Sequence, residues 1–149
     1  MKNLYQPAVV SELHERFAKL RPDSQPLWGK MTAAQMAAHC ARTMEYALGE
    51  FSLKRHPIGR LLGRRVLRSM IVDGKPMERH APTHKTVKVT DARELDPERA
   101  RLDRAIDRFA GGTAACTKEP HFFFGAMTPE EWATFSYVHL DHHLRQFGV

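Results

Sequence analysis

The chain contains 149 residues, of which 42% are hydrophobic and 27% are charged, a globular composition that excludes a disordered or fibrous chain. This length suits a single domain over residues 1–149 with one core. The net charge of +6 is compatible with an anionic partner but does not identify one. No segment is long and apolar enough to cross a bilayer, and the first residues lack the apolar stretch of a signal peptide. We therefore expect a cytoplasmic protein with no membrane partner.

Two helices are predicted in the first fifty residues. Residues 8–20 place apolar side chains at helical spacing opposite charged ones. Two prolines then interrupt the pattern, in a loop where Trp28 is expected to cover one end of the core. Thr32 and Gln35 have the spacing of a capping box, which predicts a second helix from there to about residue 49.

The next segment, KRHPIGRLLGRRVLRSMIV, predicts a basic amphipathic helix that is weakened by Gly59 and Gly63. Its expected buried face consists of Ile58, Leu61, Leu62, Val66, Leu67, Met70 and Ile71. Arginines from Arg60 to Arg68 lie opposite this face. Such a face can bind phosphates, but it is more often simply solvated, and no recognition helix or stacking aromatic residue accompanies it. Nucleic acid is therefore not expected as a partner.

Residues 73–90 predict an irregular crossover because they contain glycine and two prolines. Within it the segment KTVKV is expected to be extended, since its valines alternate. Asp96, Pro97 and Glu98 provide an N-cap, a first-position proline and an early acid, and they predict a third long helix. Overall the chain is expected to be all-α, and the long connection before this helix suits a helical bundle that needs a crossover.

The last helix begins at a second capping signal, Thr128 with Glu131, and is predicted to end near residue 147. A stripe of residues recurs along it at intervals of three and four: Trp132, Phe135, His139, His143 and Gln146. Because this stripe starts with aromatic core residues, its histidines should face inward. Two imidazoles four residues apart lie one turn apart on the same face, where they can hold one metal ion.

A metal site needs a third protein ligand, and His39 in the second helix is the candidate. It lies in so apolar a segment that its imidazole requires a partner. The alternative for all three residues is a set of hydrogen-bonded histidines without a metal. His142 could replace His143 by spacing alone, although His142 is expected on a more exposed face.

These segments resemble the DinB superfamily, whose members are four-helix bundles. The resemblance rests on WGKMTAAQMAAHC and on FFFGAMTPEEWATFSYVHLDHHLRQFG, and it covers nearly the whole chain. Within the superfamily, these segments are most similar to a branch without assigned activity. It implies a DinB-like four-helix bundle with a long crossover between the second and third bundle helices. It also implies a metal site at His39, His139 and His143 that holds nickel, zinc or a similar divalent ion. Characterised members of the superfamily include low-molecular-weight-thiol transferases and a maleylpyruvate isomerase.

Three further residues are candidates for the chemistry around such a site. His121, in the loop before the last helix, could donate or accept a proton there, although a surface position is the simpler interpretation. Arg42 and Tyr46 follow His39 by one to two turns and could bind an anionic substrate, or belong to the edge of the core.

The remaining histidines lack helical partners and are expected at the surface: His14, His56, His80 and His84. Asp141 is expected to be a solvated charge, because it points away from the histidine stripe.

The leading hypothesis is a divalent-metal-dependent enzyme that acts on a small molecule, either as a low-molecular-weight-thiol transferase or as a hydrolase. Three neutral imidazoles leave the ion strongly electrophilic, which suits both reactions and does not choose between them. The alternative is a non-enzymatic module that binds a small anion or nucleic acid through the basic helix. A homodimer is also compatible with the resemblance and with the apolar segments.

Overall fold

The computed structural model describes residues 1–79, 81 and 83–149; His80 lies outside the described residues. Their regular structure is helical. The elements are α1 (Pro7–Ala18), α2 (Ala33–Ala47), α3 (Pro57–Ile71), α4 (Leu95–Ala110), the short 3-10 helix η1 (Thr113–Ala115) and α5 (Pro129–Gln146). The described part of the chain contains no strand beyond an isolated bridge between His121 and Gly125. None of its helices is long and apolar enough to cross a membrane.

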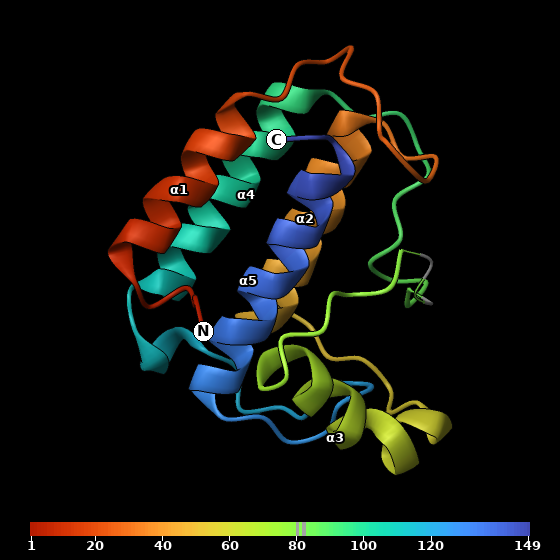
Figure 1. Ribbon diagram of the computed structural model, residues 1–149, viewed down its shortest axis with the longest axis vertical. Helices are drawn as coiled ribbons and strands as arrows, with labels where there is room; N and C mark the ends of the chain where they lie inside the picture. Colours follow the sequence, from red (N-terminus) through yellow and green to blue (C-terminus); the bar gives the residue numbers. More distant parts are fainter. Residues whose placement is uncertain (80, 82) are drawn as a thin grey trace.

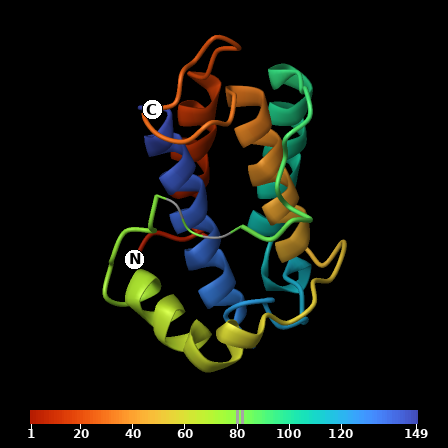
Figure 2. The ribbon, with the colours of Figure 1, turned by 90° about the vertical axis from the view of Figure 1, so that its right-hand side faces the viewer.

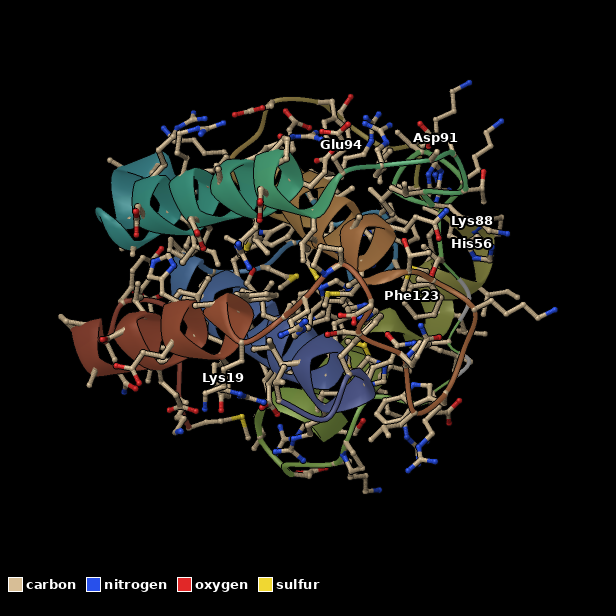
Figure 3. All side chains as sticks on the ribbon, turned by 90° about the horizontal axis from the view of Figure 1, so that it is seen from above. Lys19, His56, Lys88, Asp91, Glu94 and Phe123 are labelled. Atoms are coloured by element: carbon tan, nitrogen blue, oxygen red, sulfur yellow. The ribbon has the colours of Figure 1, made fainter. Side chains whose placement is uncertain are left out.

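Four of these helices form a bundle, as the sequence predicted. Figure 1 shows α1 and α5 running upward while α2 and α4 run downward, with α3 lying across the lower end. Figure 3, which looks along the bundle, shows α2 beside α4 and α1 beside α5. The core between them combines large side chains such as Phe17, Phe109 and Trp132 with the alanines of α2. Small residues on α2 allow a close approach of α4, which makes the most extensive helix contact in the fold.

The connection from α2 to α4, residues 48–94, is the long crossover that the sequence predicted. Because α2 and α4 point the same way, the chain must return from the lower to the upper end of the bundle. Figure 2 shows this return path passing across the face formed by α2 and α5. The expectation of an extended KTVKV segment was wrong, since Lys85–Val87 form a turn. The turn buries Val87 and Val89 all the same.

The predicted start signals of two bundle helices are confirmed. Thr32 with Gln35 and Thr128 with Glu131 each form a complete capping box. The predicted start of α4 was displaced: Glu94 is its N-cap without a side-chain bond, and Asp96 lies inside the first turn. There the Asp96 carboxylate accepts a hydrogen bond from Arg99 instead of capping the helix.

The predicted buried face of α3 is confirmed at Leu67 and Met70 but was wrong in the first part of the helix. Ile58, Leu61, Leu62 and Val66 are exposed, whereas Gly59 and Gly63 are buried together with Leu67 and Met70. The reason is a close backbone approach: a Cβ atom built on Gly63 would lie 2.1 Å from the carbonyl oxygen of Phe123. The glycines that were expected to weaken this helix are therefore its contact face.

Asp141 is not a solvated charge, contrary to expectation. Its carboxylate accepts a 2.7 Å hydrogen bond from Arg16 of α1 and pairs with Arg145, and its side chain is only 14% exposed. It points away from the histidine stripe, as predicted, but what lies on that side is α1 rather than water. The ion pair consequently ties α1 to α5.

Candidate metal centre

Three histidines from two helices meet in the middle of the bundle. His39 belongs to α2, and His139 and His143 lie one turn apart on α5. One ring nitrogen from each can be chosen so that all three lie within 4.8 Å of one another, a group that could hold a metal ion. His39 and His143 are 5% and 7% exposed, and His139 is half-buried. The structure thus brings together the three residues that the sequence singled out.

The crossover orients the first of these imidazoles. Nδ1 of His39 lies 2.7 Å from the carbonyl oxygen of Val87. A carbonyl oxygen can only accept, so Nδ1 of His39 carries the proton that it donates. In the neutral ring this leaves Nε2 without a proton and with its lone pair free for a ligand bond.

A chain of hydrogen bonds orients His143 in the same way. Its Nδ1 donates to Oε1 of Gln146 over 2.8 Å. The amide of Gln146 cannot be turned around, because its Nε2 donates to the carbonyl oxygen of Trp28 over 2.8 Å. The loop before α2 therefore fixes the amide, the amide fixes the imidazole, and Nε2 of His143 is left free.

His139 has a weaker partner of the same kind. The hydroxyl of Thr43 donates to the carbonyl oxygen of Cys40 over 2.8 Å, so its oxygen is available as an acceptor. That oxygen lies 3.4 Å from Nδ1 of His139, a long hydrogen bond. All three imidazoles hence share one arrangement, with Nδ1 bonded to the protein and Nε2 free. Ring N–H donation to a protein acceptor is the usual outer contact of metal-binding histidines.

The free nitrogens of His39 and His139 face each other at 3.1 Å. With both Nδ1 atoms protonated, neither Nε2 of the neutral rings has a proton to share, so two lone pairs point at one another. Two imidazoles on one tetrahedral zinc ion would place their nitrogens about 3.3 Å apart, from the usual zinc–nitrogen distance of about 2 Å. The residues present therefore fit a divalent cation.

The electrostatics of the cluster favour the neutral imidazoles that metal binding requires. Burial lowers the pKa of His39. Burial and then the neighbouring His39 lower the pKa of His143 to about 3. Burial, followed by His143 and His39, holds the pKa of His139 well below its ordinary value. A proton is thus disfavoured at each of the three rings.

His142 is not part of this group of three histidines. Its ring packs edge-on against Trp28, with the ring centroids 5.7 Å apart. Trp28 is also covered by the guanidinium of Arg79, at 4.5 Å from its ring centroid. Trp28 lies at one end of the bundle, as expected, with His142 on one side and Arg79 on another.

His121 is buried, at 5% exposure, rather than at the surface. Its Nδ1 accepts the backbone N–H groups of Phe123 and Phe124 at 3.1 and 3.2 Å, so the proton of the neutral ring lies on Nε2. Burial and then Arg55 lower the pKa of His121 to about 3. The ring of Phe135 contacts both His121 and His139. The structure therefore places His121 beside Phe135, which lies one turn before His139 on α5.

Arg42 and Tyr46 both hold neighbouring loops. Nε of Arg42 donates to the carbonyl oxygen of Thr86 over 2.8 Å. The hydroxyl of Tyr46 accepts the backbone N–H of Phe122 over 2.7 Å, and burial raises the pKa of Tyr46 to about 12. These contacts fasten the crossover and the loop before α5 to α2, on the side of α2 that bears His39.

Sequence reasoning placed Gln146 on the inward stripe but identified none of the groups that orient the histidines. Thr43 lies four residues after His39, so helical spacing alone could have identified it. The carbonyl groups of Val87 and Trp28 belong to irregular segments and are backbone atoms. The identity of the residue at either position does not indicate that its carbonyl group accepts a hydrogen bond.

Comparison with known families identifies the chain. Residues 5–148 match the family described as "Protein of unknown function (DUF1569)". The chain belongs to the DUF1569 family. No curated protein and no solved structure matches it. The description of DUF1569 names neither a superfamily nor an activity.

Proposed function

We propose that this DUF1569 protein is a DinB-like metalloprotein that binds one divalent ion through Nε2 of His39, His139 and His143. The observation that carries the proposal is the pair of unprotonated nitrogens 3.1 Å apart, each belonging to a ring whose Nδ1 is turned to a protein acceptor. Without a cation this arrangement is repulsive. With one it becomes an ordinary imidazole site.

The donor set favours zinc or nickel, because imidazole nitrogens suit both ions and, within the described part of the chain, no carboxylate or thiolate joins the group. Three neutral ligands leave the charge of the ion uncompensated. Bound there, the ion would act as a Lewis acid toward a small-molecule substrate, which supports a metal-dependent transferase or hydrolase. The surrounding protein supplies orientation: the acceptors on the Nδ1 atoms hold each ring in place.

The substrate class in this proposal is a low-molecular-weight thiol, on the strength of the DinB resemblance. Arg42 and Tyr46 remain candidates for substrate contacts, and His121 remains a candidate proton donor or acceptor. The buried Nε2–H of His121 is a donor at neutral pH, which supports a role in hydrogen bonding rather than as a base.

Metal analysis of the protein, purified without an affinity tag, tests the site. The wild type should contain about one divalent ion per chain, or bind added zinc or nickel at that ratio. The His39→Ala, His139→Ala and His143→Ala variants should each lose most of it. His142→Ala is the matched control, since it removes an adjacent histidine of the same helix that lies outside the cluster, and it should retain the metal.

Two results would overturn the metal site. One is a wild type that contains no metal and does not bind zinc or nickel. The other is an equal loss of metal in His142→Ala and His143→Ala. The thiol assignment has a separate test: a thiol that coordinates the ion should change the visible absorption of cobalt-substituted protein. An unchanged spectrum with every small thiol tried would refute the substrate class and leave the metal site standing.

A further inference from the structure

The outer face of α3 is unusually apolar for a surface helix. Among the described residues seven large hydrophobic side chains are exposed, and five of them lie between Ile58 and Val72. Leu61 is 85% exposed and Ile58 is 58% exposed. Because the buried face of α3 uses glycines, much of the apolar content of the helix points outward. Clusters of this kind on a protein surface mark interaction sites.

The same segment carries the positive charge of the protein. Residues 51–72 contain no acidic residue and six basic ones: Lys54, Arg55, Arg60, Arg64, Arg65 and Arg68. The charge of this segment, +6, equals the net charge of the whole chain. The residues outside the segment therefore include 17 basic residues (23 less these 6) and 17 acidic ones. The surface that presents the apolar residues is thus also the one that attracts anions.

Apolar and basic side chains share one face of α3. Ile58, Leu61, Leu62 and Arg65 follow the spacing of three and four residues that places side chains on one side of a helix. Arg68 continues that side, one turn beyond Arg65 and two turns beyond Leu61.

A cleft of about 380 Å³ adjoins this face and is lined by Arg64, Arg65, Arg68, Ile71, Val72 and Glu131. Glu131 neutralises Arg64 through hydrogen bonds of 2.7 and 3.1 Å. Arg65 and Arg68 have no ion-pair partner among the described residues and are available to an anion.

We propose that α3 binds the surface of an anionic lipid membrane, with Ile58, Leu61 and Leu62 in the outer apolar layer and Arg65 and Arg68 at the headgroup phosphates. A helix that lies in the plane of a membrane combines these two kinds of side chain and has no need to span it. The sequence led us to expect no membrane partner because it contains no segment that could span a bilayer. A helix that lies on the membrane surface needs no such segment.

Other occupants fit the face less well. A second copy of this chain in a symmetric contact would place arginines against arginines, since α3 has no acidic residue. Nucleic acid would bring phosphates against the exposed leucines, and the exposed face of α3 has no aromatic residue on which a base could stack. An anionic bilayer provides both an apolar layer and dense negative charge.

Flotation of the full chain with lipid vesicles tests this proposal. The protein should float with vesicles of phosphatidylcholine mixed with phosphatidylglycerol, should float poorly with phosphatidylcholine alone, and should be released by salt. Replacing Arg65 and Arg68 together by glutamine should weaken the partition coefficient about 25-fold, at about fivefold for each arginine. Leu61→Ser should weaken it about tenfold.

Matched controls lie elsewhere on the surface. Arg104→Gln removes an exposed arginine of α4, and Leu27→Ser removes a leucine that is 71% exposed in the loop before α2. Neither should change binding. A Leu61→Cys variant adds a direct readout, because Cys40 and Cys116 are both buried. An environment-sensitive fluorophore on that residue should shift to the blue when anionic vesicles are added.

Several outcomes would overturn the proposal: no flotation with anionic vesicles, equal binding to neutral ones, or losses as large in the control variants as in those of α3. A concentration-dependent dimer that Leu61→Ser abolishes, without vesicle binding, would assign the face to a second copy. Salt-sensitive DNA binding that competes with the vesicles or replaces them would also overturn it. Metal analysis of the same variants keeps this proposal separate from the metal site, whose three histidines belong to α2 and α5.

Discussion

Replacing Gly63 with alanine should loosen α3 from the loop that precedes α5. The new Cβ would lie 2.1 Å from the carbonyl oxygen of Phe123 and 2.9 Å from its carbonyl carbon. Both are backbone atoms, so the helix or the loop must move by about 1 Å to restore ordinary contact. Overpacking of this kind costs about 1–3 kcal/mol, whereas alanine in a helix recovers up to about 1 kcal/mol. We expect a net loss of about 1–2 kcal/mol.

Hydrogen exchange resolved along the chain measures this effect where it should occur. Exchange in α3 should accelerate roughly five- to thirtyfold, the factor that corresponds to about 1–2 kcal/mol, while α2 and α4 change less. The control is Gly111→Ala. Gly111 has an ordinary φ of −62°, and a Cβ there would lie 3.3 Å from the nearest atom, the carbonyl oxygen of Arg108. Unchanged or slower exchange in α3 of Gly63→Ala would refute the close approach as the reason for the glycine.

Three other changes test other parts of the fold. Gln146→Leu removes the acceptor of His143 and should weaken zinc affinity about 10- to 100-fold in a chelator competition, with the fold retained. Burial lowers the pKa of His14, but hydrogen bonds with two aspartates of α4 raise it by more. The interaction of protonated His14 with these aspartates therefore stabilises the fold fully below the ordinary histidine pKa of 6.5, and this stabilisation is lost as the pH rises through the raised pKa of the folded protein. His14→Gln should accordingly lower the melting temperature at acidic pH and change it little at basic pH. Tyr46→Phe leaves the N–H of Phe122 without its partner and should cost about 1–3 kcal/mol in a denaturant titration, and an unchanged midpoint would contradict that bond.

Features set by neighbouring residues could be predicted from the sequence. The capping boxes at Thr32 and Thr128 need only a hydroxyl and a side chain three residues later, and both formed as expected. The inward stripe of α5 follows from helical periodicity alone, which is why His139 and His143 could be assigned together. That His39 meets them depends on the packing of α2 against α5, which the resemblance implied and the structure shows.

The face of α3 could not be predicted in the same way. Periodicity ranks faces by the hydrophobicity of their side chains, and glycine scores poorly on that scale. In the fold the deciding quantity is how closely two backbones approach, and only a residue without a Cβ permits the distance seen at Gly59 and Gly63. The basic residues around the exposed leucines could not show whether this face binds a partner, because a solvated face and an anion-binding face have the same composition.

The crossover connects the topology of the fold to the candidate site. Since α2 and α4 run in the same direction, residues 48–94 must traverse the length of the bundle, and they do so across the face between α2 and α5. This path brings the carbonyl oxygen of Val87 to Nδ1 of His39, and the same segment accepts the hydrogen bond of Arg42 at Thr86. An up-down-up-down bundle with short loops would have no chain at that place, and the imidazole of His39 would lack the acceptor that turns its Nε2 toward α5. The long connection is therefore part of the site, and changes that displace Val87 should reduce metal affinity although its side chain donates nothing to the ion.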